Sequence, residues 1–343
     1  MKSILFFHNN NDYTGSTRVL ADVIARDYAD QVVPIIVNKN HGRGFLSELP
    51  NVRMIGFWKP LWKGRAIPVF STRIVHLQGF LLALIYGWRY QTFYINTILP
   101  CYAALMGRLY GKQVIYHVHE KLISGSLSVR LMEWVFTHTK AHRIFVSKYT
   151  QDCYPANPSC TSEVCYNRLG KCFLDKVVIK PVGERKRDTV LMIASLSKVK
   201  GLSTFMRVAR LLPQLHFRLI LSADMRSIRS YFGESMPENV RLISAQSNIH
   251  PYLYEADLML NLSNPFFGVE TFGMTILEAM AYGIPSIVPN VGGPIELIED
   301  GHNGYCVDVT DVELVASKIC DALERGNYER LSEGTCERFE QFK

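Results

Sequence analysis

The sequence has no apolar run long enough to cross a membrane. Its most apolar stretch, GFLLALIYGW near residue 80, falls far short of the ~20 residues that a spanning helix needs. The first residues, MKSILFFHNNN, hold one lysine and five apolar residues before the asparagines, which is typical of a β-strand and not of a signal peptide. We therefore expect a cytoplasmic protein.

Cysteine patterns for disulfides or metal binding are also missing. The eight cysteines come without a secretory signal, which favours reduced thiols. Cys153, Cys160, Cys165 and Cys172 cluster, but their spacing lacks the paired C-x2-C of zinc sites. We expect buried or incidental thiols and no bound metal.

Charge and apolar content exclude a disordered chain. The sequence has 48% apolar and 20% charged residues, a globular composition, and its 343 residues suit two domains better than one. The net charge of +7 favours an anionic partner such as a nucleotide or an acidic membrane surface. No DNA- or RNA-binding motif and no basic tail accompany it, so a nucleic acid is not expected.

Short β-branched runs alternate with helix-length segments along the chain. Several of these runs are apolar without alternation, which is typical of strands buried on both faces of a parallel sheet. The pattern occurs twice and predicts two doubly wound, Rossmann-like α/β domains. The expected strands are residues 4–7, 32–37, 92–95, 114–118 and 144–147, followed by 190–194, 217–221, 240–244, 258–262 and 286–288.

The boundary between the two domains is expected in the charged segment KPVGERKRD, residues 180–188. This segment has no hydrophobic period, which predicts a linker, although a long surface loop would have the same composition. We therefore expect an N-terminal domain over residues 1–180, a C-terminal domain over 181–325 and a last helix over 326–343. Ligands of such folds bind in a central cleft at the carboxyl ends of the strands.

The stretch VETFGMTILEAMAYG, residues 269–283, predicts a helix over about residues 273–282. Gly273 would let a ligand approach the backbone closely. The N–H groups of Gly273, Met274 and Thr275 would then face an anion at the positive end of the helix dipole. A diphosphate is the natural occupant of such a turn in an α/β fold.

Two glutamates flank this turn. Glu270 precedes the helix, where it can be a simple N-terminal charge partner or can accept hydrogen bonds from ligand hydroxyls. Glu278 lies inside the helix among apolar neighbours, and side chains lean toward a helix N-terminus, so it can reach back to the turn. A solvent-facing glutamate is the alternative for Glu278.

Three elements of this region together resemble the family-four retaining glycosyltransferases, which have the GT-B fold. They are E-x7-E from Glu270 to Glu278, the loop PNVGGPIE after the next expected strand, and EDGHNG at residues 299–304. A lone E-x7-E would be weak, but three elements in this order and spacing are specific. The motifs HVHE and ETFGMTILEAM resemble one bacterial branch of that family.

The resemblance implies a site for a nucleotide-diphosphate sugar, with the acceptor bound mainly to the first domain. Glu270 would hold hydroxyls of the donor sugar and Glu278 the ribose, while Gly292 and Gly293 would leave space near the sugar. The diphosphate would lie on the turn formed by Phe272, Gly273, Met274 and Thr275.

The segment SLSKVKGLSTF resembles the G-R-L-x3-K-G segment of the same family. Lys200 matches the lysine that would neutralise the leaving diphosphate; a surface lysine at a helix start is the alternative. Ser195 occupies the donor-binding position where the family has arginine. Lys198 or Arg18 could substitute for that arginine; otherwise Lys200 and the helix amides would face the phosphates alone.

The first domain offers two further candidates. In HNNNDYTGSTRVLADVIA, Gly15 starts a helix and predicts a second anion-facing turn, or else a plain helix capped by Thr14 or Ser16. The strand QVIYHVHE places His117 and His119 on one face. By resemblance, His119 would face the donor sugar and the acceptor, with the acid Glu120 beside it. Structural histidines are the alternative, and zinc is disfavoured because no third ligand is near.

Tryptophans and basic residues interleave between residues 58 and 90. A loop followed by a core helix is the favoured interpretation of this segment. The alternative is peripheral contact with an anionic membrane surface, which would suit a lipid-linked acceptor. The residues are Trp58, Lys59, Trp62, Lys63, Arg65, Arg73, Trp88 and Arg89.

Together these features predict a metal-independent, retaining glycosyltransferase of polysaccharide or glycan biosynthesis. It would move a sugar from a UDP- or GDP-sugar to a saccharide or lipid-linked saccharide, without a cofactor, in the cytoplasm or at the inner face of the membrane. Glu270, Lys200 and His119 are the expected catalytic residues. As in the GT-B fold, the last helix would cross back to the first domain. A non-catalytic nucleotide-binding subunit and a nucleotide-sugar epimerase are the alternatives. A phosphorylase that uses pyridoxal phosphate is not expected, because no feature of the sequence supports that cofactor.

Overall fold

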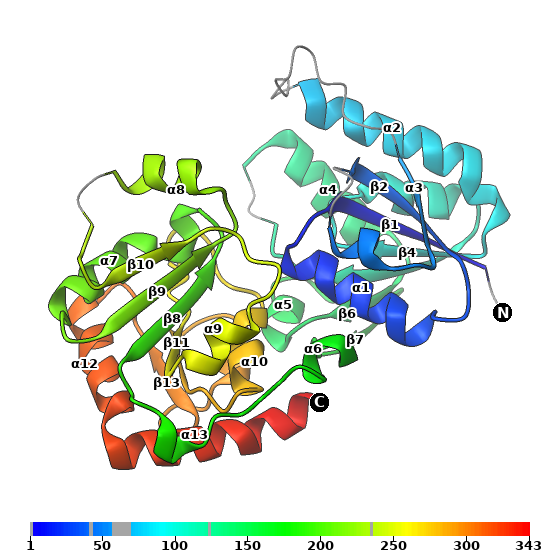
Figure 1. Cartoon of the computed structure of the whole chain (residues 1–343). Coiled ribbons are helices and arrows are strands. Elements are labelled where there is room, and N and C mark those ends of the chain that lie inside the picture. Colours follow the sequence, from blue (N-terminus) through cyan, green and yellow to red (C-terminus); the bar gives the residue numbers. More distant parts are fainter. Residues whose placement is uncertain (1–2, 41–43, 57–69, 123–124, 234–235) are drawn as a thin grey trace. The chain divides into compact units, whose positions relative to one another are not determined.

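The computed structural model describes residues 3–40, 44–56, 70–122, 125–233 and 236–343, without the side chains of residues 39–40 and 70–75. The chain divides into two compact units, Met1–Tyr166 and Asn167–Lys343 (Figure 1). The N-terminal unit and the C-terminal unit are described separately below.

The N-terminal unit is a parallel sheet with helices on both faces (Figure 1). Helix α1 (Gly15–Asp27) packs on one face, and α2 (Phe70–Tyr86), α3 (Cys101–Leu109) and α4 (Leu127–His138) pack on the other. Side chains of successive residues in β1 therefore enter different cores, which explains the continuous apolar run. The strand order is β3 (Val52–Ile55), β2 (Val33–Asn40), β1 (Ile4–Asn11), β4 (Thr92–Asn96), β5 (Gln113–Val118), β6 (His142–Phe145), β7 (Thr161–Val164).

The C-terminal unit repeats this winding with a second parallel sheet. Its strand order is β10 (Val240–Ile243), β9 (His216–Leu221), β8 (Thr189–Ala194), β11 (Leu258–Leu260), β12 (Ser286–Pro289), β13 (Gly304–Val307). One large apolar core joins this sheet to α7 (Leu202–Leu211), α12 (Val312–Leu323) and the start of α13 (Arg325–Phe339). Helices α8 (Met225–Phe232), α9 (His250–Glu255), α10 (Met274–Met280) and α11 (Pro294–Leu297) complete the unit.

The prediction of two doubly wound, parallel α/β units is confirmed. Every expected strand is present, with ends that differ by a few residues. The sequence missed β3, β7 and β13, which are all edge strands of four residues. Edge strands are open on one side, so they lack the continuous apolar run that identifies the central strands.

Each sheet has a point where the winding reverses. In the N-terminal unit β1 and β4 are neighbours, and the chain proceeds outward from them in opposite directions; β8 and β11 play the same part in the C-terminal unit. Loops that follow such a strand pair diverge, so they leave room for a ligand. We therefore expect the ligand-binding residues in the loops just after these four strands.

Residues 180–188, expected as a linker, lie in the C-terminal unit and are anchored there by Arg185. This side chain is 3% exposed; its Nη1 lies 2.5 Å from the carbonyl oxygen of Ala256 and its Nη2 lies 2.9 Å from that of Tyr282. Nη1 also lies 4.0 Å from the buried carboxylate of Asp257. Helix α13 packs on the same unit, where Ser332 Oγ donates to the carbonyl of Gly283. Its return to the first domain stays a prediction.

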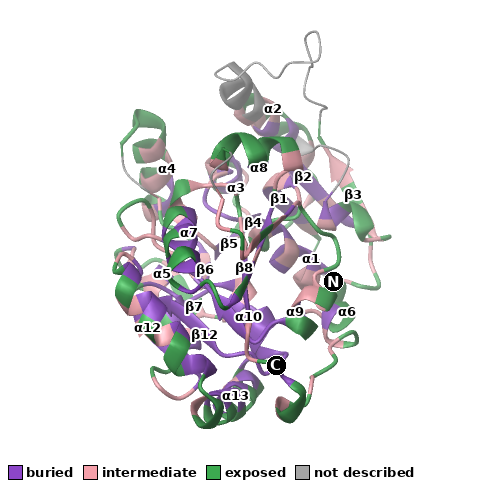
Figure 2. Cartoon of the chain, turned by 60° about the vertical axis from the view of Figure 1, so that its left-hand side comes forward, coloured by how far each residue is buried: buried purple, intermediate pink, exposed green. Residues whose placement is uncertain are grey.

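Helix α2 corrects the expectation of a core helix, because it is buried on one side only. Its inward side includes Gly79, Leu82 and Ala83, while four large apolar side chains of the helix are exposed: Leu77, Leu81, Leu84 and Ile85. Figure 2 colours the described residues of the chain by burial. The basic and aromatic residues expected at positions 58–65 lie outside the described part of the chain, as does the side chain of Arg73. Among the described residues, no helix is both long and apolar enough to cross a bilayer.

The Arg185 anchor predicts a large and local loss of stability. Replacing Arg185 with Met should lower the free energy of unfolding of the C-terminal unit by about 3–5 kcal/mol, because Asp257 would remain as a buried, unpaired charge. Urea unfolding followed by far-UV circular dichroism measures this loss. The exposed neighbour Lys186→Met is the control and should stay within about 0.5 kcal/mol. Equal effects of the two substitutions would contradict the anchor.

Candidate functional site

Two loops after β8 and β11 bring a cation and an anion together. Lys200 ends the 3-10 turn Lys198–Lys200 that follows β8, and Glu270 lies in the loop after β11. Lys200 Nζ lies 2.5 Å from Glu270 Oε2, and the two side chains are 28% and 18% exposed. Ser263 Oγ donates to the same carboxylate oxygen over 3.3 Å. Two expected catalytic residues thus meet where the winding of the sheet reverses.

The charge of Glu270 is stabilised by its surroundings. Burial alone would raise the pKa of this carboxyl group, but the ammonium of Lys200 and hydrogen bonds from Lys200, Asn261 and Ser263 outweigh burial and lower the pKa. Glu270 is therefore a carboxylate at neutral pH. It can accept hydrogen bonds from hydroxyl groups, while Lys200 can meet an anion.

A close backbone contact fixes the Lys200 loop. Gly201 has φ of 66°, in the left-handed region, and a Cβ atom there would collide with the carbonyl of Leu262. The backbone N–H of Asn264 also donates to the carbonyl of Val199 over 2.7 Å. The loops after β8 and β11 therefore touch along their backbones, and only glycine at position 201 permits this.

The two adjacent glycines of the PNVGGPIE loop have a related role. A Cβ at Gly292 would collide with the carbonyl of Glu270, and one at Gly293 with the carbonyl of Thr271. The N–H of Gly293 donates to the carbonyl of Glu270 over 2.9 Å. Space near a sugar was expected of this pair, and the structure adds a direct reason: the glycines hold the backbone that carries Glu270.

Helix α10 follows the same loop. It begins at Met274, after Gly273 with φ of 110°, and its first turn includes the half-buried Thr275. Phe272 is buried beneath this turn. Glu278 is only 4% exposed, which excludes the solvent-facing alternative. A glutamate so far inside an apolar helix needs a polar partner, which is consistent with a role in a site.

Ser195 stands where the related glycosyltransferases have arginine, and it supplies no positive charge there. Ser195 is exposed, and its carbonyl accepts the N–H of Ser197 over 2.8 Å. Lys198 lies three residues away in the same loop and is exposed. The guanidinium of Arg18 lies 5.5 Å from the centre of the Phe45 ring within the N-terminal unit.

The DGHNG turn is explained by its asparagine. Asn303 is fully buried; its Oδ1 accepts the N–H of Glu299 over 2.7 Å, and its Nδ2 donates to the carbonyl of Leu297 over 3.1 Å. The carbonyl of Asn303 accepts the hydroxyl of Thr335 on α13. The asparagine of this motif therefore supports the fold of the unit.

In the N-terminal unit, Asn96 connects three segments at the reversal point between β1 and β4. Its Nδ2 lies 3.1 Å from the carbonyl oxygen of Ser16, beside Gly15 at the start of α1, and 3.1 Å from His8 Nδ1 in β1. Its Oδ1 lies 2.9 Å from His119 Nε2, just after β5. Asn96, which the sequence analysis did not single out, thus links His119 to Ser16, the neighbour of Gly15.

These contacts fix the proton on the imidazole of His119. A carbonyl oxygen can only accept, so the nitrogen of Asn96 must face Ser16. His8 Nδ1 lies 3.1 Å from Asn96 Nδ2 and 3.4 Å from the carbonyl oxygen of Asn96, and His8 Nε2 lies 3.0 Å from Thr17 Oγ1. The oxygen of Asn96 faces His119, so His119 carries its proton on Nε2. The hydroxyl of Thr17 donates a hydrogen bond to Asp12 Oδ1 over 2.8 Å.

The histidines near this network are neutral. Burial lowers the pKa of His8 to about 4 and that of His117 to about 4, and it holds the pKa of His119 well below the usual value, with further repulsion from the other two. The rings of His117 and His119 lie 4.3 Å apart between centroids, which confirms that they share a face. His119 can therefore act as a neutral hydrogen-bonding group.

Glu120 shows the opposite response to burial. Burial raises its pKa to about 7, although N–H groups such as that of Ile98, whose nitrogen lies 2.7 Å from Glu120 Oε1, act in the other direction. The neighbouring acid noted in the sequence is thus protonated in part at neutral pH. Thr14 occupies the N-cap position of α1, but it makes no side-chain capping hydrogen bond; its own N–H donates to Asp12 Oδ1.

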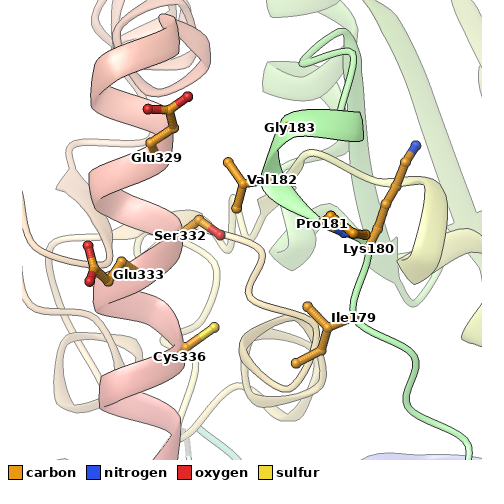
Figure 3. A pocket seen from close by; sticks show the side chains of 9 residues that line it. All are labelled: Ile179, Lys180, Pro181, Val182, Gly183, Glu329, Ser332, Glu333 and Cys336. Carbon is orange, nitrogen blue, oxygen red and sulfur yellow. The ribbon is translucent and has the colours of Figure 1, made fainter.

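A hollow of about 410 Å³ lies elsewhere in the C-terminal unit, between the segment before β8 and α13 (Figure 3). None of the expected site residues lines it. Ile179 and Val182 face Ser332 and Cys336 across it, and the carboxylates of Glu329 and Glu333 stand at its rim. It is a gap where the chain enters the unit, without the convergent polar groups of a binding site.

Residues 178–338 match the family model described as "Glycosyl transferases group 1". The match lies within the C-terminal unit and covers a little under half of the chain. The N-acetyl-alpha-D-glucosaminyl L-malate synthase of Bacillus anthracis is 30% identical over 178 residues, 48% of this chain and 45% of that protein. The sucrose synthase of Acidithiobacillus caldus is 46% identical over 55 residues, 16% of this chain and 7% of that protein. The chain thus matches less than half the length of either relative.

Solved structures share the fold over the whole chain. The crystal structure of Anabaena HepE in complex with UDP and glucose has a TM-score of 0.80 at 19% identity and covers 100% of this chain and 95% of that one. Sucrose-phosphate synthase from Thermosynechococcus elongatus has a TM-score of 0.75 at 16% identity, with coverage of 100% and 95%. These neighbours are GT-B glycosyltransferases, so the predicted fold class is confirmed.

The Asn96 network predicts a change in histidine titration. Asn96→Asp cannot donate to Ser16 or His8, and its carboxylate would favour the charged imidazoles. In NMR titrations His8 should stay neutral at pH 5 in the unaltered protein and be largely protonated at that pH in the variant. The exposed His216 of the C-terminal unit is the internal reference, because the substitution lies in the other unit. Identical curves for His8 and His119 in the two proteins would refute the network.

Glu120 predicts a stability difference that depends on pH. Its folded pKa of about 7 exceeds its ordinary value of 4.5, so the stability that the protonated carboxyl permits is lost as the pH rises through 7. Glu120→Gln should therefore melt about 3 °C higher at pH 8 and nearly unchanged at pH 5. The nearby histidines are the same in both proteins and cancel in the difference.

Tryptophan fluorescence measures this change, because all four tryptophans lie in residues 1–166 and report on the N-terminal unit. The matched control is Glu48→Gln on the exposed surface of the same unit. A shift of equal size at both pH values would show that the substitution acts through packing and not through ionisation.

Proposed function

We propose that the chain is a retaining, metal-independent glycosyltransferase that uses a nucleotide-diphosphate sugar, of the UDP or GDP type. The acceptor would be a saccharide or a lipid-linked saccharide in polysaccharide or glycan biosynthesis, reached from the cytoplasm. The observation that carries the proposal is the Lys200–Glu270 pair, held at the reversal point of the second sheet by Gly201 and Gly293. The family match covers the same unit.

The pair offers complementary groups to a diphosphate sugar. A carboxylate already held in its charged form can orient sugar hydroxyls, and the ammonium of Lys200 can stabilise the negative charge that develops on the leaving diphosphate. The amides of residues 273–275 would add to that charge stabilisation, and Glu278 would accept the ribose hydroxyls. A diphosphate oxygen would take the proton of the acceptor hydroxyl, so no side-chain base is required.

The N-terminal unit supplies a neutral group to this reaction. We propose that His119 contacts the donor sugar and the acceptor, with its Nε2–H directed to Asn96 and its ring uncharged at neutral pH. An uncharged ring would not compete with Lys200 for the diphosphate. Gly15 and the amides that start α1 would lie near the same ligand.

A nucleotide-binding subunit without turnover is the second candidate. Ser195 favours it, because an exposed hydroxyl replaces the cation that the related glycosyltransferases have there. If Lys198 compensates, Lys198→Met should weaken nucleotide binding although it lies outside the Lys200–Glu270 contact. An epimerase would convert the sugar of the donor without any acceptor.

The nucleotide site can be tested by thermal shift with UDP, GDP, ADP and their glucose conjugates. UDP is the first choice because the structural neighbour HepE was solved with UDP and glucose. At 100-fold excess over Kd, a ligand should add about 2.7 kcal/mol of stability. Lys200→Met and Glu278→Gln should each remove most of the shift, while Glu313→Gln on the exposed side of α12 should keep it.

Measurement of released nucleotide and of the sugar product separates the candidates. Release with transfer to an acceptor supports the transferase, binding without release supports the subunit, and a changed sugar on intact donor supports the epimerase. If no nucleotide stabilises the protein, the donor site is wrong.

A further inference from the structure

Three helices of the N-terminal unit form one layer with two unlike surfaces. Helix α3 packs against α2 on one side and α4 on the other, and the inner surfaces of all three cover the sheet. The contact of α2 with α3 is close, because a Cβ at Gly79 would collide with the ring of Tyr102. The inner surface is thus fully committed to the fold.

The outer surface of this layer is apolar. Ten of the 21 exposed large apolar side chains of the described residues lie on it: Leu77, Leu81, Leu84, Ile85 and Trp88 on α2 and the following turn, Leu105 and Leu109 on α3, and Leu127, Leu131 and Trp134 on α4. We call these ten residues the outer apolar face. Their spacing of three or four along each helix makes continuous stripes. Scattered exposed apolar residues need no explanation, but a group of this size indicates an interaction surface.

Basic residues surround this face and acids are nearly absent. From Leu49 to His119 the sequence has no Asp or Glu and has eight Lys or Arg. The chain as a whole carries +7, so all residues outside that stretch sum to −1. On the layer itself Arg89, Arg108 and Arg130 are exposed, and Glu133 on α4 is its one described acid. Three exposed arginines and one described acid thus lie on this layer, so the described charge beside the outer apolar face is positive.

Two residues of the outer apolar face are tryptophans. Trp88 and Trp134 are 59% and 52% exposed. The guanidinium of Arg89 lies 5.1 Å from the centre of the Trp88 ring, and Lys112 Nζ donates to the carbonyl of Trp88 over 3.1 Å. Tryptophan beside arginine or lysine suits the boundary between lipid headgroups and acyl chains, where an apolar ring and a cation are both accommodated.

We propose that the outer apolar face docks on the surface of an anionic lipid bilayer. The apolar stripes would enter the headgroup region, while Arg89, Arg108 and Arg130 would meet lipid phosphates. Because no described helix can span a bilayer, the contact is peripheral. The proposal goes beyond the glycosyltransferase activity and does not depend on it, since vesicle binding requires neither a donor nor an acceptor.

A second copy of the chain fits this face less well. In a twofold dimer the same patch meets itself, so the basic residues of one copy would lie against those of the other. Like charges brought together in an interface are destabilising. An anionic bilayer supplies the opposite charge to the whole face at once.

Vesicle co-sedimentation of the full chain tests the proposal. The protein should bind vesicles of equimolar phosphatidylcholine and phosphatidylglycerol, bind phosphatidylcholine alone much less, and dissociate from the mixed vesicles in high salt, where charges are screened. Arg89→Gln and Arg108→Gln should each lower the partition coefficient about fivefold. The triple variant Leu127→Gln, Leu131→Gln and Trp134→Gln should lower it about tenfold or more, because the α4 stripe would no longer enter the interface.

The matched controls are Arg207→Gln and Leu211→Gln, two exposed residues on α7 of the C-terminal unit. They should bind vesicles as the unaltered protein does. Binding that is equal for charged and neutral vesicles, or equal in all variants, would overturn the proposal. A concentration-dependent dimer that the α4 variant abolishes, without vesicle binding, would overturn it in favour of a second copy. Nucleotide thermal shifts of the same variants should be unchanged, which keeps this test separate from that of the donor site.

Discussion

The candidate donor site depends on one backbone contact, that of Gly201 with the carbonyl of Leu262. It brings the loop after β8 against the loop after β11, and so sets the distance from Lys200 to Glu270. The Gly292–Gly293 loop packs against the carbonyl groups of Glu270 and Thr271. The ion pair is thus a product of backbone packing, in which three glycines leave room for carbonyl groups. A side chain at any of the three positions would displace this backbone, and Lys200 and Glu270 would then no longer lie within hydrogen-bond distance.

The two units treat charge in opposite ways. The C-terminal unit keeps the Glu270 carboxylate charged beside Lys200, with further hydrogen bonds from Asn261 and Ser263. The N-terminal unit keeps His8, His117 and His119 neutral through burial. A charged side chain suits the electrostatic stabilisation of charge that develops on a ligand, whereas a neutral imidazole suits hydrogen bonds that orient a ligand.

Much of this was predictable from sequence, and the failures have physical causes. The central strands of both sheets follow from the continuous apolar runs of the sequence. Lys200 and Glu270 could be named as candidates, but their direct contact could not, because 70 residues separate them and only the sheet joins them. Asn96 escaped notice because its importance lies in three partners from different segments. The adjacent glycines were expected to leave space near a sugar, which stays a prediction; their contact with the carbonyls of Glu270 and Thr271 could not be foreseen, because it joins two loops that are distant in sequence.

The edge strands, three of which sequence analysis missed, also limit how far another chain could extend either sheet. Both edges of each sheet, β3 and β7 in one and β10 and β13 in the other, are only four residues long. An edge strand presents unpaired backbone groups on which another chain could extend the sheet, and short edges give such an intruder few groups to pair with. The two parallel sheets therefore offer little template for aggregation at their edges, where such templates usually form.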